Sequence, residues 1–331
     1  MQIQPFTISH LRSGGIITNY HCSSSCRHCL YCSSPRWPKE YITPETTWKN
    51  LTTIRNLGCR SIHIGGGEPL LNPDCVAATL IAAAEAGVTV EYVETNSSWF
   101  HTLDVACATL ERVAEAGLET LLVSISPFHN EHIPFLKVKG VCEACRRTGI
   151  SVFPWISTFI DEIETFDDTT VHSLDEYRHC FGDDYIENLP RRYWIAPGGR
   201  ALDTFGKFAV ARSVSAIAAE NRTGCVELAH TGHFHLDLFG NYVPGLCSGL
   251  AICRDDLGKP LDAGKYPIIT NLFEGGIGAF VSWAIEYYGY SIHRGSYPSK
   301  CHLCNDIRRF LVVEKGLRLH ELQPVGYYLY R

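Results

Sequence analysis

The stretch Cys22-Ser23-Ser24-Ser25-Cys26-Arg27-His28-Cys29 places three thiols within eight residues, separated by three residues and then by two. Disulfides within the run cannot account for all three cysteines, because a pair would leave the third thiol over. Thiolates this close can all reach one soft metal centre, and iron–sulfur clusters are held at such spacings. Three protein ligands on a four-iron cluster leave one iron open to bind a cofactor or substrate.

A second stretch contains a glycine run that begins at Gly65, about thirty-six residues after Cys29. Ser61–Ile64 has the pattern of a short buried strand, and it leads into Gly65-Gly66-Gly67-Glu68-Pro69. Glycines at the end of a strand let the backbone bend sharply and approach a ligand closely. Alone, such a run indicates only a turn.

In this order the two stretches resemble the signature of the radical S-adenosylmethionine (SAM) superfamily. The family has Cys-x3-Cys-x2-Cys in a loop after the first barrel strand and a Gly-Gly-Glu-Pro motif after the second. His28 stands where the family usually has an aromatic residue. A zinc knuckle or scattered buried cysteines are the alternatives that the spacing alone leaves open.

The resemblance implies a [4Fe-4S] cluster on Cys22, Cys26 and Cys29 that also chelates SAM. It further implies reductive cleavage of SAM to a 5′-deoxyadenosyl radical. Gly65, Gly66, Gly67, Glu68 and Pro69 would then form the turn whose backbone meets the amino group of SAM.

Composition places the chain among ordinary globular proteins. It has 331 residues, 45% hydrophobic and 19% charged, with a formal net charge of −6. No Lys/Arg run suggests a nucleic-acid partner, and no segment is expected to span a membrane, since Glu85 breaks the alanine-rich stretch. Without an export signal, the fifteen cysteines fit a reducing cytoplasm and metal binding better than disulfides.

Strands and helices alternate regularly from about residue 10 to Phe159, and the pattern loosens beyond it and ends near residue 220. This alternation predicts parallel βαβ units, an α/β fold in which a partial (β/α)6 TIM-type barrel carries the chemistry at the carboxyl ends of its strands. Tyr193–Ala196 is the predicted sixth strand. Polar residues end the third and fourth strands, and the resemblance assigns SAM contacts to them: Asn96, after Thr95, and Ser124 and Ser126. For the serines, a turn role is equally compatible.

For residues 221–331 the sequence pattern predicts a smaller α+β domain built on a β-hairpin, with Gly240-Asn241 as its turn. Cys225 precedes the hairpin, Cys247 follows it, and Cys301 and Cys304 form a distant Cys-x2-Cys. This order resembles the twitch domain, a short relative of SPASM that holds an auxiliary four-iron cluster. Cys253 is a rival ligand, because the spacing after the hairpin is longer than usual; zinc or no metal are alternatives.

His233, His235 and Asp237 alternate along one predicted strand, so their side chains share a face. We interpret them as a polar face lining the substrate cavity, and a hydrolytic metal site, with His230 nearby, is the less favoured interpretation.

The predicted function is hydrogen abstraction from a small polar substrate, such as a sugar or aminocyclitol, leading to oxidation or epimerisation. Cys253, or Cys247 if it binds no metal, could return hydrogen in an epimerase. The resemblance also implies a reductant such as flavodoxin or ferredoxin. Alternatives are modification of a ribosomal peptide, activation of a glycyl-radical protein, and a non-catalytic iron–sulfur or zinc protein. The short N-terminal lead argues against a leader-recognition module.

Overall fold

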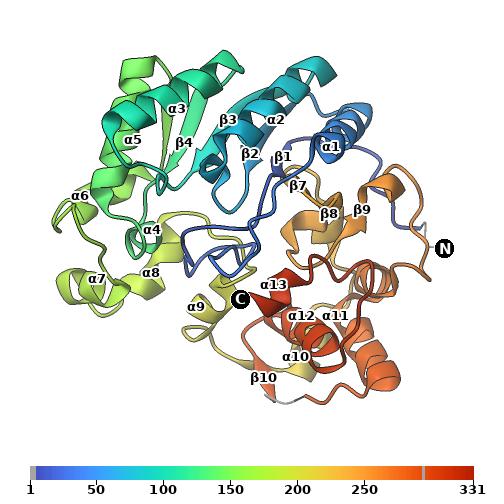
Figure 1. The fold of residues 1–331 in the computed structure, drawn as a ribbon. Coiled ribbons are helices and arrows are strands. Elements are labelled where there is room, and N and C mark those ends of the chain that lie inside the picture. Colours follow the sequence, from blue (N-terminus) through green and yellow to red (C-terminus); the bar gives the residue numbers. More distant parts are fainter. Residues whose placement is uncertain (1–4, 293–294) are drawn as a thin grey trace.

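The computed structural model describes residues 5–292 and 295–331. Its main sheet has eight strands in the order β5-β4-β3-β2-β1-β7-β8-β9 (Figure 1). Their bounds are β1 Gly14–Ile17, β2 Ser61–Gly65, β3 Thr89–Thr95, β4 Thr120–Ser124, β5 Ser151–Trp155, β7 Phe234–Asp237, β8 Asn241–Val243 and β9 Ile252–Cys253. The six strands from β5 to β7 are parallel, and β8 and β9 continue the sheet antiparallel. The predicted α/β fold with a C-terminal hairpin is confirmed.

Four helices connect the first five strands and cover the outer face of the sheet (Figure 1). They are α1 Pro44–Asn56, α2 Pro73–Ala86, α3 Leu103–Glu115 and α5 Phe135–Thr148. The side-chain oxygens of Thr43, Asn72 and Thr102 accept hydrogen bonds from the first turns of α1, α2 and α3. These caps fix where each helix begins. Because the strands that the helices connect pair in parallel, the carboxyl ends of these strands lie at the same edge of the sheet.

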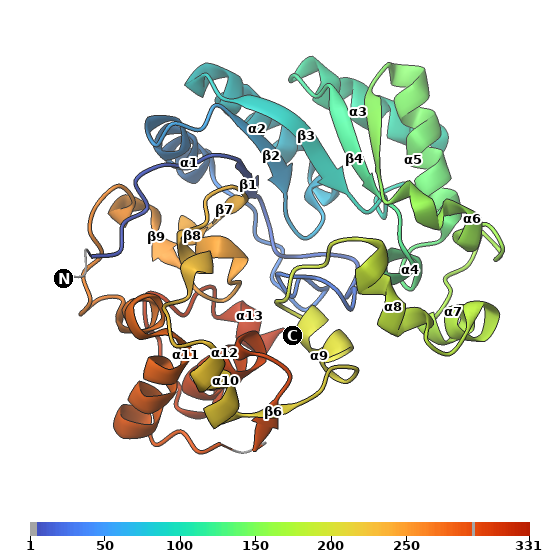
Figure 2. The same cartoon turned by 180° about the vertical axis from the view of Figure 1, so that it is seen from behind.

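The sixth parallel strand is not where the sequence predicted it. Tyr193–Ala196 forms no strand, so that prediction is wrong. Instead the following residues pack on the cysteine loop, where the Arg200 N–H donates to the carbonyl of Cys29 at 3.0 Å. The sixth parallel strand is β7, which pairs with β1 at the opposite side of the sheet (Figure 2).

Further helices and one short strand pair complete the described elements. The remaining helices are α4 Pro127–Asn130, α6 Ile160–Ile163, α7 Leu174–Phe181, α8 Tyr185–Arg192, α9 Ala201–Gly206, α10 Val214–Glu220, α11 Pro267–Tyr288, α12 Lys300–Arg309 and α13 Gly326–Leu329. A two-stranded antiparallel pair joins β6 Arg212–Ser213 to β10 Ser296–Tyr297.

Helix α11 corrects the expectation about apolar segments. By length and composition it could cross a membrane, with a mean hydropathy of 1.4, although Asn271 and Glu274 interrupt the apolar run. The expectation that no segment spans a membrane did not take this helix into account, because its apolar run is interrupted in the sequence. The backbone breaks at Gly276, where φ is 67°, and Ile268, Leu272 and Phe280 are buried in the core. Core helices commonly share this composition.

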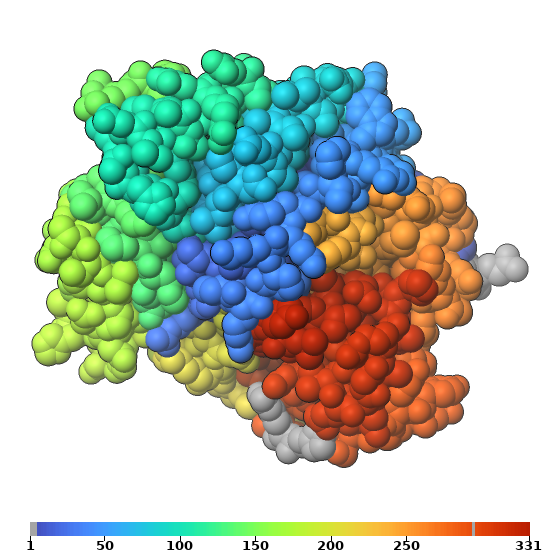
Figure 3. Space-filling model, viewed as in Figure 1, coloured from blue at the N-terminus to red at the C-terminus, as the bar shows by residue number. Residues whose placement is uncertain are grey.

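One hydrophobic core joins the two ends of the sequence. Buried residues from the N-terminal segment, such as Leu11 and Ile16, belong to the same cluster as Leu236 of β7 and Leu311 near the C-terminus. Figure 3 shows the C-terminal segments packed directly against the N-terminal ones. The sheet and this core both continue across residue 220.

Candidate active site

The three cysteines of the first motif lie in the loop after β1, at the carboxyl end of the parallel sheet. Cys22 and Cys26 are buried and Cys29 is half-buried. All three line one cavity of about 280 Å³. Five of the residues that were predicted to bind the cofactor also line this cavity: Gly66, Gly67, Pro69, Asn96 and Ser124.

The thiols of this loop influence one another. Burial raises the pKa of Cys22 to about 12 and that of Cys26 well above its usual value, and the neighbouring cysteines raise both further. The Asn96 side-chain amide and the Ser24 N–H donate to the Cys22 sulfur at 3.3 and 3.4 Å. Three cysteines on the wall of one cavity, one of them with hydrogen-bond donors at its sulfur, fit a soft metal cluster, because a bound cation would stabilise the thiolate form of a buried cysteine.

The glycine turn packs against the chain that leads into the cysteine loop. The Gly67 N–H donates to the carbonyl of Asn19 at 2.6 Å, and the Asn19 side-chain amide bonds the carbonyls of His21 and Glu68. A Cβ on Gly67 would lie 2.1 Å from the His21 carbonyl oxygen. Close backbone contact between the two motifs therefore requires glycine here, whatever the turn binds.

Gly65 and Glu68 lie outside the cavity wall. The buried Glu68 carboxylate accepts hydrogen bonds from the Leu70 N–H, the Thr95 hydroxyl and the Asn96 N–H at 3.1, 2.9 and 2.6 Å. Burial raises the pKa of Glu68 to about 7 against the effect of these donors. Glu68 thus fastens the end of β2 to the end of β3 and positions Asn96 over the Cys22 sulfur.

Ser126 and His28 have local partners. Ser126 is buried beside the cavity, and its hydroxyl bonds His129 Nδ1 at 2.7 Å. Of the two predicted serines, only Ser124 lies on the cavity wall. The His28 ring packs on Phe128 at 4.7 Å between centroids, and burial holds its pKa well below the usual value. His28 is thus an uncharged ring at neutral pH that packs among other rings.

Arg200 is a site residue that the sequence analysis missed. Its Nε donates to the Cys26 carbonyl at 2.9 Å and its Nη2 to the Ser33 carbonyl at 2.6 Å, while Nη1 is buried with no partner in the described structure. The guanidinium also lies on the cavity wall. The sequence shows only the Pro197–Gly199 turn before it, which indicates a turn and does not by itself single out Arg200.

The four C-terminal cysteines surround a second cavity of about 560 Å³. Cys225, Cys247, Cys301 and Cys304 all line it, although they are far apart in the sequence. Burial raises the pKa of Cys225 to about 12 and of Cys301 to about 11, and the nearby Cys304 thiol adds to both shifts. Burial and the same neighbours raise the pKa of Cys247. This donor set also fits a soft metal cluster.

Cys253 does not join this group. It ends β9, where its N–H donates to the Tyr266 hydroxyl at 3.0 Å, and it lines neither cavity. The structure therefore brings Cys247, and not Cys253, together with the other three cysteines.

The two cavities adjoin each other. Trp194, Ala196 and His233 line both. Of the three residues predicted to form a polar strand face, His233 therefore lines both cavities, and His235 and Asp237 line neither. Asp237 instead closes the hairpin, where its carboxylate accepts hydrogen bonds from the Tyr20 hydroxyl and from the N–H groups of Phe239 and Asn241.

Comparison with known proteins gives one family match and several more distant likenesses. Residues 16–171 match the model of the Radical SAM superfamily. A stretch of 125 residues is 29% identical to GTP 3′,8-cyclase of Chlorobaculum tepidum, covering 38% of this chain and 35% of the cyclase. The chain thus spans about a third of the length of this curated relative.

Two solved structures resemble the fold remotely. BtrN in complex with AdoMet and 2-DOIA is 13% identical with a TM-score of 0.43, over 82% of this chain and 91% of BtrN. Native anSMEcpe with bound AdoMet is 12% identical with a TM-score of 0.41, over 70% of this chain and 74% of anSMEcpe. The matched residues, a little under half of the chain, contain both motifs of the first cavity, Cys22–Cys29 and Gly65–Pro69.

Proposed function

We propose that this protein is a radical SAM enzyme that oxidises a small polar substrate by removing a hydrogen atom, an electron and a proton: the 5′-deoxyadenosyl radical would take the hydrogen atom, an auxiliary cluster the electron, and water the proton. The observation that carries the proposal is the second cysteine set. Its cavity shares Trp194, Ala196 and His233 with the cavity of the first motif. An electron acceptor held there would be next to a substrate bound in the first cavity.

Cys22, Cys26 and Cys29 would hold a [4Fe-4S] cluster, which with bound SAM supplies a 5′-deoxyadenosyl radical. The chain's own residues orient the reactants. Asn96 donates to the Cys22 sulfur, and Glu68 holds the Asn96 backbone in place. The Gly66–Gly67 backbone and Ser124 remain the proposed contacts to SAM, and the unpartnered Nη1 of Arg200 is a further donor on the same wall.

The first cavity is suited to a small molecule with hydroxyl or amino groups. Its wall combines the aromatic rings of Tyr92, Trp155 and Trp194 with the polar groups of Glu94 and His129. Aromatic faces exclude water from a radical, and the polar groups can fix the orientation of a sugar or aminocyclitol. The proposal includes a cytoplasmic location and a flavodoxin or ferredoxin as reductant.

Oxidation is favoured over epimerisation by the placement of the remaining cysteines. An epimerase needs a thiol that returns hydrogen to the substrate. Cys253 lies outside both cavities, and Cys247 lies with the other three cysteines of the second cavity. Cys225, Cys247, Cys301 and Cys304 are thus the proposed ligands of an auxiliary [4Fe-4S] cluster.

The test is the iron and sulfide content after anaerobic reconstitution, combined with the release of 5′-deoxyadenosine on adding SAM and dithionite. We expect about eight irons in the wild type and about four in each of two variants, Cys22/Cys26/Cys29→Ala and Cys301/Cys304→Ala. The first variant should release no 5′-deoxyadenosine, whereas the second should still release it.

Cys142/Cys145→Ala, on helix α5, is the matched control and should keep about eight irons. A wild type with only about four irons would contradict the auxiliary cluster and return epimerisation to consideration. No 5′-deoxyadenosine from a protein with a full first cluster would contradict the catalytic proposal.

A further inference from the structure

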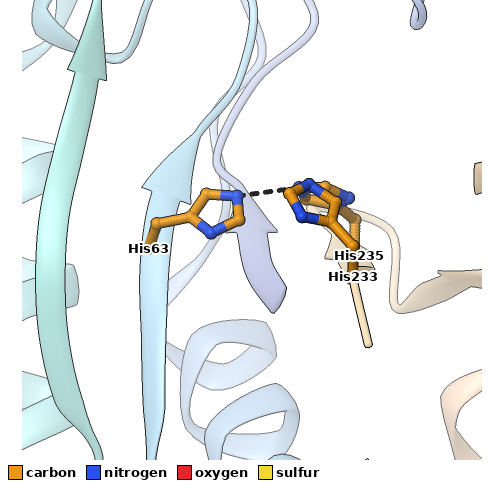
Figure 4. Close-up of side chains that lie close together, drawn as sticks. All are labelled: His63, His233 and His235. Carbon is orange, nitrogen blue, oxygen red and sulfur yellow. Dashed lines mark hydrogen bonds between the residues drawn. The ribbon is translucent and has the colours of Figure 1, made fainter. Parts of the chain in front are cut away.

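Two histidines from different strands meet above a glycine. Gly15 of β1 lies in register with His63 of β2 on one side and with His235 of β7 on the other. The two imidazoles meet with their Nε2 atoms 2.9 Å apart (Figure 4). A Cβ on Gly15 would lie 2.6 Å from the His63 ring, so only glycine leaves room for this meeting.

A third histidine joins this pair from just before β7. His233 lies two residues before His235 in the chain, and the centroids of the two rings are 5.0 Å apart. One ligand nitrogen from each of His63, His233 and His235 can be chosen so that all three lie within 4.8 Å of one another. Figure 4 shows the three rings converging from β2 and from the start of β7.

The outer contacts of the rings resemble those of metal-binding histidines. His235 Nδ1 bonds the Tyr31 hydroxyl at 2.6 Å, which leaves its Nε2 directed at His63. The His63 ring bonds the backbone of Gly14 and stacks on Tyr92 at 5.2 Å between centroids. In metal sites, hydrogen bonds of this kind fix the tautomer and the orientation of the ligand.

A carboxylate completes the set of donors. Glu94 Oε1 lies 3.8 Å from His63 Nε2, and the side chain reaches the first cavity with 40% of its surface exposed. Burial lowers the pKa of His63 to about 3, so the imidazole is uncharged at neutral pH and its lone pair is available. Three imidazoles and one carboxylate are nitrogen and oxygen donors, unlike the two sulfur sets.

We propose that His63, His233 and His235 bind one divalent metal ion of the zinc class, with Glu94 as the oxygen ligand. Two nitrogens at about 2.0–2.1 Å from a tetrahedral zinc ion are about 3.4 Å apart. The 2.9 Å between the two Nε2 atoms therefore needs only a small outward movement of the rings. The site adjoins the wall shared by the two cavities, because its ligand His233 lines both, whereas His63 and His235 are buried behind it.

This proposal does not depend on radical chemistry, and its test is direct. Protein with reconstituted clusters is exposed to Zn²⁺, passed through a desalting column and analysed for zinc content and zinc-edge X-ray absorption. We expect about one zinc per chain, with nitrogen and oxygen neighbours at about 2.0 Å and no sulfur neighbour. The His63→Ala/His235→Ala double variant should retain no zinc.

Two further variants separate a metal site from a fold effect. Tyr31→Phe removes only the hydroxyl that holds His235, and we expect zinc affinity to fall about 10- to 100-fold while the protein stays folded. His172→Gln changes another buried histidine, which bonds the Asp167 carbonyl, and should leave zinc binding unchanged.

Three outcomes would overturn the proposal. They are a wild type that retains no zinc, zinc with sulfur neighbours, and zinc that is lost in Cys301/Cys304→Ala but kept in the histidine double variant. In the first case the three histidines form a hydrogen-bonded polar patch without a metal.

Discussion

At the scale of single residues, Arg200 holds the cysteine loop in its shape. Its backbone N–H bonds the Cys29 carbonyl, and its guanidinium bonds the carbonyls of Cys26 and Ser33. The loop has no regular secondary structure over the three cysteines. These bonds therefore take the place of the hydrogen bonds that a helix or strand would supply to the backbone of the three proposed iron ligands.

We predict that Arg200→Lys lowers both the stability of the protein and its retention of the first cluster. A lysine is a single point donor and cannot bond two carbonyls in the fixed directions of a guanidinium. A hydrogen bond to a charged group contributes about 1.5–3 kcal/mol, so we expect unfolding free energy to fall by roughly 2 kcal/mol. Iron content after gel filtration and the denaturation midpoint measure the two effects.

The matched control is Arg36→Lys, whose exposed guanidinium donates to the Tyr330 carbonyl at 3.1 Å. It should keep the cluster. Equal iron retention in wild type and Arg200→Lys would show that the loop holds its shape without this bridge.

A second prediction concerns the glycine turn. In Gly67→Ala the new methyl group meets the His21 carbonyl, a backbone atom that cannot rotate away. We expect a loss of about 1–3 kcal/mol in unfolding free energy and a weakened first cluster. Denaturant unfolding of the anaerobic protein provides the measurement.

Gly278→Ala is the opposite case within helix α11. Its Cβ would make an ordinary contact with Ala218 at 3.4 Å. Alanine is the better helix former, so this change should stabilise the protein by about 0.5–1 kcal/mol. A destabilised Gly278→Ala together with a neutral Gly67→Ala would contradict the packing of both glycines.

At the scale of elements, helix α11 begins on a buried carboxylate. The two oxygens of Glu321 accept hydrogen bonds from the N–H groups of Ile268 and Ile269 at 2.7 and 2.8 Å. These N–H groups belong to the first turn of α11 and have no partner within the helix. Burial nevertheless raises the pKa of Glu321 to about 8.

This raised pKa predicts a stability that falls as pH rises. Between its unfolded value of 4.5 and about 8, the folded state keeps a proton on Glu321 that the unfolded state has lost. From pH 5 to pH 7 we therefore expect Glu321 to lower the unfolding free energy by about 2 kcal/mol. Melting the wild type and Glu321→Gln in a series of buffers measures this contribution.

The Glu321→Gln variant should be less stable at pH 5, since its amide nitrogen cannot accept one of the two hydrogen bonds. Its disadvantage should shrink as the pH rises toward 8. Parallel pH profiles of the two proteins would mean that the carboxyl group does not titrate in this range. Glu45→Gln, on the exposed face of α1, is the control and should leave the slope nearly unchanged.

The elements also show which parts of the fold a sequence can predict. Helices such as α2 were predictable because their caps and apolar periods are local signals. The Cys22–Cys29 and Gly65–Pro69 motifs were predictable because their chemistry depends on short spacing. The pairing of β7 with β1 was not, because the partners are more than two hundred residues apart and no local pattern records their register.

The same limit applies to the candidate site. The four C-terminal cysteines were predicted together from their order around the hairpin, and the fold brings them around one cavity. Arg200 and His63 gave no signal of their own, because their importance comes from carbonyls and rings on distant strands. Tyr193–Ala196 has the composition of a strand, but it does not pair with β5. The chain that follows it instead packs on the cysteine loop.

At the scale of the whole molecule, one continuous sheet connects the two cysteine sets, so we expect both to unfold together. Strand β1, which delivers the first motif, has β2 on one side and β7 on the other (Figure 2). The strand β7 begins the hairpin that delivers Cys247. A substitution that destabilises β7 should therefore also destabilise the loop that carries Cys22, although the two are far apart in sequence.

We predict that Leu236→Ala lowers the stability of the whole chain in a single transition. Leu236 is fully buried on β7 and lies in register with Ile16 of β1. Truncating a buried leucine costs about 2–5 kcal/mol, and the cavity would open in the core shared by both ends of the chain. Amide hydrogen exchange should show that protection falls together in β1, β2 and β7.

The control is Leu329→Ala on α13, where the side chain is 47% exposed and little should change. If Leu236→Ala instead lowered protection only in the hairpin, or if the chain melted in two separate steps, residues 221–331 would be an independent domain. The position of the shared histidine His233 between the two cavities would then depend on how two bodies dock. With a single transition, the sheet itself sets the distance between the two cysteine sets, because β1 and β7 are hydrogen-bonded neighbours.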